Sequence, residues 1–221
     1  MKSYSAAVWL SALLLLGLSV GRSSAQAVST KTDLSSVGSG LKETTFGDLA
    51  ADSLRDAADT DAAFVPSSAM RPVTLSAPSI QQEKIADVLS ATTAPENAYV
   101  TLRVKGKQIL AALERSVSHL PESFDGYLQV SGLKVTYDPS RPPGSRIISV
   151  VFASGAALSP DSQYTAAMTQ PLGLGGMGYF QAWNESDIVK TSDSSLQTVI
   201  VNYAASHQPL NEQVDGRLTS Q

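Results

Sequence analysis

The chain has no cysteine and only two histidines among its 221 residues. Without cysteine, an exported domain has no disulfides, no catalytic thiol and no thiolate metal site, so its stability must come from its core. His119 and His207 stand apart from the carboxylates and second histidines that metal centres place at short spacings. We therefore expect no catalytic residue, no metal site and no bound cofactor.

Charged residues are also scarce in this sequence. They make up 16% of the chain, hydrophobic residues make up 43%, and the formal net charge at pH 7 is −4. A chain of this length and composition can build one sizeable core, so we expect one folded domain. A net negative charge offers no basic surface for neutralising phosphates, which argues against nucleic acid as a partner.

Long hydrophobic runs are absent beyond the first residues, which are typical of an export signal. Lys2 supplies positive charge, an apolar run extends from Ala6 to Val20, and Ala25-Gln26-Ala27 has the small-x-small form of a cleavage site. We predict a signal peptide over residues 1–27, cleaved after Ala27, and a periplasmic or secreted protein with no membrane contact after cleavage. The alternative is an uncleaved anchor, although the run is shorter than the ~20 residues that a spanning helix needs.

The segment after the predicted cleavage site has little apolar surface to bury. Residues 28–40 are rich in serine, threonine and glycine, which is typical of a flexible leader. We expect organised chain from about Leu41, and hence a domain over residues 41–221.

That domain is organised around the stretch Tyr127 to Asp138, where apolar and polar residues alternate on both sides of Ser131-Gly132. The alternation predicts strand structure with a break in the middle. The run Arg146 to Ala153 is rich in β-branched residues and predicts a buried strand, and Pro139 to Gly144 predicts the turn before it. We therefore predict a hairpin in an antiparallel sheet.

Periodicity predicts further helices and strands along the chain. Helices are expected from Phe46 with Thr44 or Thr45 as N-cap, over Ser79 to Leu89 behind a serine N-cap, over Lys107 to Ser118, and over Ser194 to Ser206. Strands are expected over Asp61 to Val65, Ala98 to Val104 and Gln163 to Met168. A loop is expected over Pro66 to Pro72, and a flexible loop over Gly173 to Gly178. The elements lack the regular rhythm of a doubly wound parallel sheet, so we predict an α+β fold.

Four short motifs follow one another at specific spacings. They are Glu43-Thr44-Thr45-Phe46-Gly47-Asp48-Leu49 with Ala51-Asp52-Ser53-Leu54-Arg55, Val104-Lys105-Gly106-Lys107-Gln108-Ile109-Leu110 with Leu113-Glu114, Gln129-Val130-Ser131-Gly132-Leu133 with Tyr137-Asp138, and Gly175-Gly176-Met177-Gly178-Tyr179. From about Val37 onward, the chain thereby resembles the C-terminal, substrate-binding domain of the 5'-nucleotidase and UDP-sugar hydrolase family. The resemblance implies a four-layer α/β/β/α arrangement. It also implies that relatives hydrolyse phosphate esters in a separate N-terminal domain with two metal ions, which we expect this chain to lack.

The resemblance further implies a ligand site near the last motif. In relatives, a Gly-Gly-x-Gly-Tyr loop lies beside the bound base. Its counterpart here consists of Gly175, Gly176, Gly178 and Tyr179, with Met177 where relatives often carry aspartate.

Other contact positions of the family are only partly kept. Two phenylalanine rings that sandwich the base in relatives are replaced by Pro95 and Pro171, while Asn97 is retained. Because stacking on an aromatic ring is worth roughly 1 to 3 kcal/mol per base, we expect weakened binding of the base. Arg71 is retained and its guanidinium can hold a phosphate or carboxylate by two parallel hydrogen bonds, unless it is simply an arginine on an exposed loop. Asp48 replaces a polar or basic contact residue and would repel a phosphate.

Three functions remain open at this point. The first is a non-catalytic binding module of a nucleotide-catabolism family, which holds a nucleotide or another anionic ligand chiefly through Arg71, beside Asn97 and the loop 175–179. The second is the substrate-binding half of a hydrolase that a separately encoded metallophosphatase domain completes. The third is a structural or interaction protein whose ligand pocket has decayed.

Overall fold

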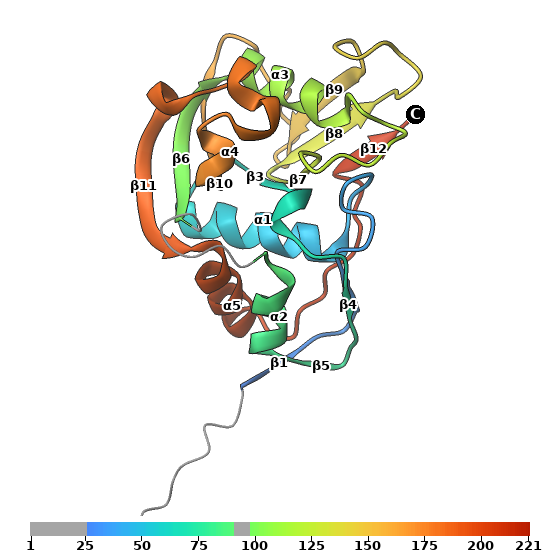
Figure 1. The fold of residues 1–221 in the computed structure, drawn as a ribbon, viewed down its shortest axis with the longest axis vertical. Coiled ribbons are helices and arrows are strands. Elements are labelled where there is room, and N and C mark those ends of the chain that lie inside the picture. Colours follow the sequence, from blue (N-terminus) through green and yellow to red (C-terminus); the bar gives the residue numbers. More distant parts are fainter. Residues whose placement is uncertain (1–25, 91–97) are drawn as a thin grey trace, which may run out of the picture.

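The computed structural model of the protein describes residues 26–90 and 98–221 (Figure 1). Its helices are α1 (Thr45–Ala58), α2 (Gln82–Val88), α3 (Gly106–Val117), α4 (Gln170–Gly173) and α5 (Leu196–Ser206), with 3₁₀ turns η1 (Ser67–Ala69), η2 (Gly176–Gln181) and η3 (Glu185–Asp187). Its strands are β1 (Ala27–Ser29), β2 (Leu34–Ser35), β3 (Ala62–Pro66), β4 (Thr74–Leu75), β5 (Ser79–Gln81), β6 (Ala98–Lys105), β7 (Leu128–Ser131), β8 (Leu133–Tyr137), β9 (Ile147–Phe152), β10 (Gln163–Thr169), β11 (Ile188–Ser195) and β12 (Leu218–Ser220).

A five-stranded sheet in the order β11-β6-β10-β3-β7 forms the centre of the molecule. Strands β3 and β10 run parallel, and the other neighbouring pairs are antiparallel. Helices α1, α2 and α5 lie on one side of this sheet (Figure 1). The predicted α+β class is confirmed.

Both faces of the five-stranded sheet are buried, as strand β3 shows. Alternate side chains of a strand point to opposite faces. Ala63 and Val65 therefore pack with α1, α2 and α5, whereas Ala62 and Phe64 enter a second core. This second core also contains residues of α3, α4 and the three-stranded sheet β12-β8-β9. The fold thus contains two sheets with helices packed in both cores, in agreement with the α/β/β/α arrangement that the resemblance implies.

The stretch predicted as a broken strand passes from one sheet to the other. Its first half, β7, pairs with β3, and its second half, β8, forms the predicted antiparallel hairpin with β9. Gly132 lies at the crossing with φ of +82°, and a Cβ at this position would collide with the carbonyl oxygen of Asp61. Glycine is needed here because it alone combines this backbone conformation with so close an approach.

Two predictions about single elements are wrong, namely the burial of β9 and the first residue of α2. Strand β9 was expected to be buried, yet only Val150 is buried and Ile148 is 38% exposed, because β9 is the edge strand of the small sheet. The helix expected to begin behind Ser79 starts three residues later, without a side-chain cap. Residues 79–81 instead form β5, which pairs with β1.

Helix α1 agrees with the sequence more closely. Thr44 is the N-cap, and its hydroxyl accepts a hydrogen bond from the Gly47 amide. This bond satisfies one of the free amides at the start of the helix, as capping threonines commonly do. Phe46, Leu49 and Leu54 are fully buried against the sheet, which is the apolar face that periodicity predicts.

Residues 28–40, expected to form a flexible leader, are part of the packed domain. Val28 and Leu34 are fully buried, and β1 and β2 pair with β5 and β4. Composition did not predict this, because two apolar side chains are enough to anchor a short segment to an existing core.

The C-terminal residues 207–221, here named the C-terminal strap, close the fold from the other end of the chain. The strap runs beside the N-terminal segment at Thr30 and Leu210 and ends in β12, which pairs parallel to β8. The buried carboxylate of Glu43 accepts hydrogen bonds from three strap amides, those of Asp215, Gly216 and Leu218. Among the described helices, none has the length and apolar character needed to cross a membrane.

Candidate functional site

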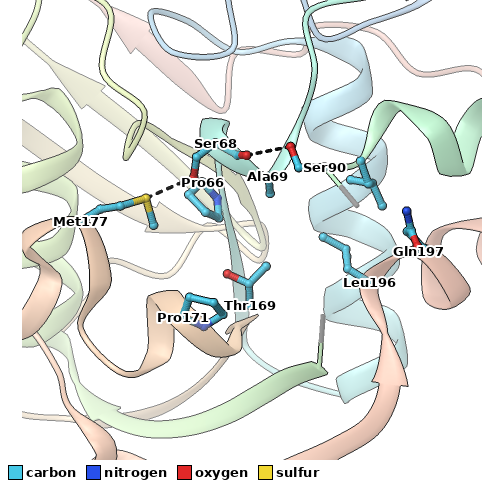
Figure 2. Close-up of a pocket in the computed structure, with 10 residues that line it drawn as sticks. Pro66, Ser68, Ala69, Ser90, Thr169, Pro171, Met177, Leu196 and Gln197 are labelled. Carbon is cyan, nitrogen blue, oxygen red and sulfur yellow. Dashed lines mark hydrogen bonds between the residues drawn. The ribbon is translucent and has the colours of Figure 1, made fainter. Parts of the chain in front are cut away.

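A cavity of about 150 Å³ opens at the ends of the parallel strands β3 and β10. Each strand contributes its last residue to the wall, Pro66 from β3 and Thr169 from β10. Figure 2 shows these side chains with others that converge from η1, α4, η2, the two residues after α2 and the start of α5. The carboxyl ends of parallel strands are a common place for ligand sites in α/β sheets.

Ser68 connects three walls of the cavity. Its hydroxyl donates a hydrogen bond to Sδ of Met177 at 3.2 Å, and its carbonyl oxygen accepts one from the hydroxyl of Ser90 at 3.0 Å (Figure 2). On the α5 side, the Gln197 amide donates to the carbonyl of Ala86 at 3.3 Å, which joins α5 to α2. These bonds hold together segments that are distant in sequence.

The lining residues that the structure describes are uncharged. The apolar members are Pro66, Ala69, Leu89, Pro171, Met177 and Leu196, and the polar members are Ser68, Ser90, Thr169 and Gln197. Apolar walls with a few hydroxyl and amide groups suit a neutral ring that forms hydrogen bonds. A phosphate would find no cation among these lining residues.

The glycine-rich segment shapes one side of the cavity. Gly175 and Gly178 have φ of +88° and +86°, and Met177 between them also has a left-handed φ of +56°. A Cβ on Gly176 would lie 2.7 Å from the carbonyl oxygen of Pro171, so the backbone of this segment folds back closely on α4. The predicted close backbone approach is confirmed, and it brings Pro171 and Met177 to the same wall.

Tyr179 is in the core and does not line the cavity, contrary to the role that the resemblance implies. Its side chain is fully buried, its ring stacks on Trp183 at 5.5 Å, and its hydroxyl donates to the carbonyl of Gly126 at 2.6 Å. Burial raises the pKa of this phenol, so the hydroxyl keeps its proton and remains a donor. Tyr179 therefore anchors the glycine-rich segment from behind.

The other positions implied by the resemblance lie elsewhere. Arg71 is exposed, is absent from the cavity wall, and its Nη1 donates to the Asp87 carbonyl near the end of α2 at 3.4 Å. The expectation that Arg71 holds an anion in the pocket is therefore not supported by the geometry. Asp48 is buried on α1, away from the cavity lining. Asn97 and Pro95 lie outside the described residues.

Both histidines stack on the aromatic ring of a nearby side chain. His119 stacks on Phe124, with ring centres 4.2 Å apart, and His207 stacks on Tyr203 at 3.9 Å. Within residues 26–90 and 98–221, no three side chains of the types that bind metals are grouped closely enough to hold an ion. The metal ions that the resemblance assigns to a neighbouring domain do not fit the residues of this part of the chain.

Most of the cavity wall could not be predicted from the sequence. Ser68 falls in the predicted loop from Pro66 to Pro72, but nothing in its sequence context distinguishes it from other loop serines. Leu196 and Gln197 open a helix that was predicted for its buried face alone. The features that indicated the site were the glycine-rich segment and Pro171, which the resemblance places at a base-contact position.

Comparison with known proteins identifies the family of this chain. The model of the family described as 5'-nucleotidase, C-terminal domain, matches residues 19–185. The snake venom 5'-nucleotidase of Macrovipera lebetinus is 29% identical over 125 residues, which are 53% of this chain and 30% of that protein. The apyrase of Tabanus yao is 30% identical over 139 residues, which are 58% of this chain and 25% of that protein. The chain thus spans less than a third of either relative.

Solved structures give the same assignment. The 5'-nucleotidase precursor of Thermus thermophilus superposes with a TM-score of 0.77 at 27% identity, covering 87% of this chain and 39% of that one. The NAD nucleotidase of Haemophilus influenzae shares the fold, with a TM-score of 0.73 at 11% identity over 88% of this chain and 37% of that one. This chain belongs to the family of 5'-nucleotidase C-terminal domains.

Proposed function

We propose that this chain is a nucleoside-binding module of the 5'-nucleotidase type, which holds the uncharged part of a nucleotide and does not itself break the phosphate ester. The observation that carries the proposal is the uncharged cavity whose wall includes Pro171 and Met177. Both residues belong to the segment that the resemblance places beside the bound base. A base edge can form hydrogen bonds with hydroxyls such as those of Ser90 and Thr169, while its ring lies against the apolar walls.

This proposal differs from a phosphate-based one in the ligand it selects. No cation is found among the cavity-lining residues within 26–90 and 98–221, and Arg71 donates to a backbone carbonyl outside the cavity. Affinity should therefore come from the base and ribose, with little added by the phosphate. Loss of two stacking rings in this chain keeps that affinity modest.

A panel of ligands in a thermal-shift assay tests the proposal. A ligand at 100 times its dissociation constant stabilises a protein by about 2.7 kcal/mol, which gives a visible shift. Adenosine, uridine, AMP and UMP should each raise the unfolding temperature, and inorganic phosphate at the same concentration should not. Stabilisation by phosphate alone, or by nucleotides without their nucleosides, would contradict the proposal.

A second candidate function is the substrate-binding half of a two-chain hydrolase. It is favoured by the coverage of relatives, because this chain spans 39% of the Thermus protein and 30% of the Macrovipera protein. A separately encoded metallophosphatase domain would then supply the metal ions and the hydrolytic step. Release of phosphate from AMP by a mixture with such a domain, but by neither component alone, would establish it. Turnover by this chain alone would refute both candidates.

We also propose that the protein is exported and loses residues 1–27. The charged start, the apolar run and the small-x-small site form a complete signal. Ala27 and Val28 both lie in β1, which pairs with β5, so we expect cleavage to take place before this segment folds. Mass spectrometry of the secreted protein should give Val28 as the first residue. Recovery of intact Met1 would contradict export with cleavage.

A further inference from the structure

The Met177 side of the cavity depends on an unusual backbone. Met177 has φ of +56° and ψ of +23°, a left-handed conformation that side chains other than glycine rarely adopt. The following residue, Gly178, is left-handed too. Such conformations cost on the order of 1 to 3 kcal/mol and persist only where the surroundings enforce them.

The surroundings that enforce it are centred on Arg115 of α3. Its Nε and Nη2 both donate to the carbonyl oxygen of Met177, at 3.1 and 2.9 Å. Its guanidinium also lies over the ring of Phe124, 4.5 Å from the centroid. Both contacts fix the plane of the guanidinium, which a flexible lysine could not reproduce.

Two further observations show that this arginine is dedicated to the turn. Arg115 forms no ion pair with a carboxylate of the described residues, so its polar contacts go to a backbone carbonyl. A Cβ on Gly178 would lie 2.8 to 3.0 Å from three guanidinium atoms, so only glycine leaves room for it. Arg115 could keep this position only beside a residue without a Cβ, and the φ of +86° also favours glycine at 178.

We infer that Arg115 is a positioning residue for the cavity. By holding the carbonyl of Met177, it fixes the left-handed turn and keeps the Met177 side chain in the wall, where Sδ accepts the hydrogen bond from Ser68 (Figure 2). Arg115 itself does not line the cavity. Its effect on a nucleoside rests on the proposed function, whereas its effect on Met177 does not.

Methyl NMR of the full chain, with ¹³C-labelled methionine, tests the inference without a ligand. In Arg115→Ala the Met177 methyl signal should move towards the position of an unstructured methionine, while the signal of the fully buried Met168 stays in place. Arg115→Lys keeps the charge but has a single donor nitrogen, so it should move the Met177 signal in the same direction but less. The matched control is Arg103→Ala, which removes an exposed arginine from β6 and should move neither signal.

A second variant perturbs the same turn by changing the glycine and not the arginine. Gly178→Ala puts a methyl group where the guanidinium lies and also strains a left-handed backbone, so it should move the Met177 signal at least as far as Arg115→Ala does, even if the latter folds poorly. The inference is overturned if the Met177 signal of folded Arg115→Lys and Gly178→Ala matches wild type. It is equally overturned if Met168 moves as far as Met177, because that result indicates general loosening.

Titration with adenosine connects the turn to binding. Arg115→Ala should bind adenosine about tenfold more weakly than wild type, and Arg115→Lys should recover part of the loss. Wild-type affinity in a variant whose Met177 signal has moved would show that the turn does not serve the ligand. If wild type binds no nucleoside, the proposed function fails, and the methyl signals still decide the role of Arg115.

Discussion

The carboxylate of Asp48 lies 3.6 Å from Nε of Arg217 and forms no hydrogen bond with any described residue. Arg217 directs its Nη1 and Nη2 to the carboxylate of Asp52, at 2.7 and 2.8 Å. Its Nε is closer to Asp215, at 3.0 Å. Asp48 is therefore a fully buried acid beside an arginine whose donors are already engaged.

The pKa of Asp48 follows from this geometry. The pKa of Asp48 is raised to about 9, chiefly because the group is buried; the charge of Arg217 opposes this shift, and the charges of Glu43, Asp52 and Asp215 add to it. The group is therefore neutral at pH 7 in the folded protein and ionised in the unfolded chain. The folded state therefore holds a proton that the unfolded state releases. The contribution of Asp48 to the free energy of unfolding is fully present below about pH 4 and is lost as the pH rises to about 9.

We predict that Asp48→Asn flattens this pH dependence. Burial also raises the pKa of Glu212, to about 7, so the variant should still lose stability between about pH 4.5 and 7. Between pH 7 and 9, only wild type should continue to lose stability. Urea unfolding at pH 5, 7 and 9 measures the free energies, and Asp56→Asn, on the exposed side of α1, controls for the loss of one charge. Equal slopes for wild type and Asp48→Asn above pH 7 would contradict the assignment.

Glu43 should be a large contributor to the attachment of the C-terminal strap. Glu43→Ala leaves the amides of Asp215, Gly216 and Leu218 without their acceptor, and hydrogen bonds to a charged group are worth about 1.5 to 3 kcal/mol each. We predict a loss of roughly 3 kcal/mol in the free energy of unfolding, and faster hydrogen exchange at these amides. Glu122→Ala, at an exposed position, should change stability by less than about 0.5 kcal/mol. Unchanged exchange at the three amides in Glu43→Ala would show that other contacts hold the strap.

Restoring an aromatic ring at Pro171 should increase affinity for the base. Pro171 lies in the cavity wall and is exposed, so a phenylalanine there has room to meet a bound ring. We predict that Pro171→Phe binds adenosine about tenfold more tightly, in line with the worth of one stacking contact. Calorimetry gives the affinity, and Pro142→Phe, in the turn before β9, is the control. An affinity no higher than that of the control would place the base elsewhere.

Local patterns predicted the elements whose own residues determine them. The spacing of Phe46, Leu49 and Leu54 with the Thr44 cap is enough to specify α1, and β-branched alternation is enough to specify the hairpin of β8 and β9. Elements that depend on distant partners were missed. Val28 and Leu34 are buried because the fold provides a core for them, and residues 79–81 are extended because β1 lies beside them.

The candidate site likewise has one part that local patterns predicted and another that depends on distant partners. The glycines at 175 and 178 marked the site because a left-handed turn requires their residue type. The position of Arg71 did not predict its contact, because its guanidinium bonds to the end of α2, which no local pattern reveals. Ser68 and Ser90 became neighbours through tertiary packing alone.

The strand β11 illustrates a third reason for failure. Its sequence from Ile188 to Ser195 is mostly polar, because it lies at the exposed edge of the five-stranded sheet and pairs only with β6. An edge strand needs few apolar side chains, so periodicity gives little signal there. For this reason β11 was not predicted from the sequence.

Calorimetric titration of adenosine into wild type, Ala69→Phe and Arg71→Ala tests the central claim most directly. Ala69 lines the cavity, and a phenylalanine there would fill much of its volume of about 150 Å³. We predict that wild type and Arg71→Ala bind adenosine equally well, and that Ala69→Phe keeps its folded circular dichroism spectrum but binds none. Undiminished binding by Ala69→Phe, or loss of binding in Arg71→Ala, would contradict a nucleoside site in this cavity.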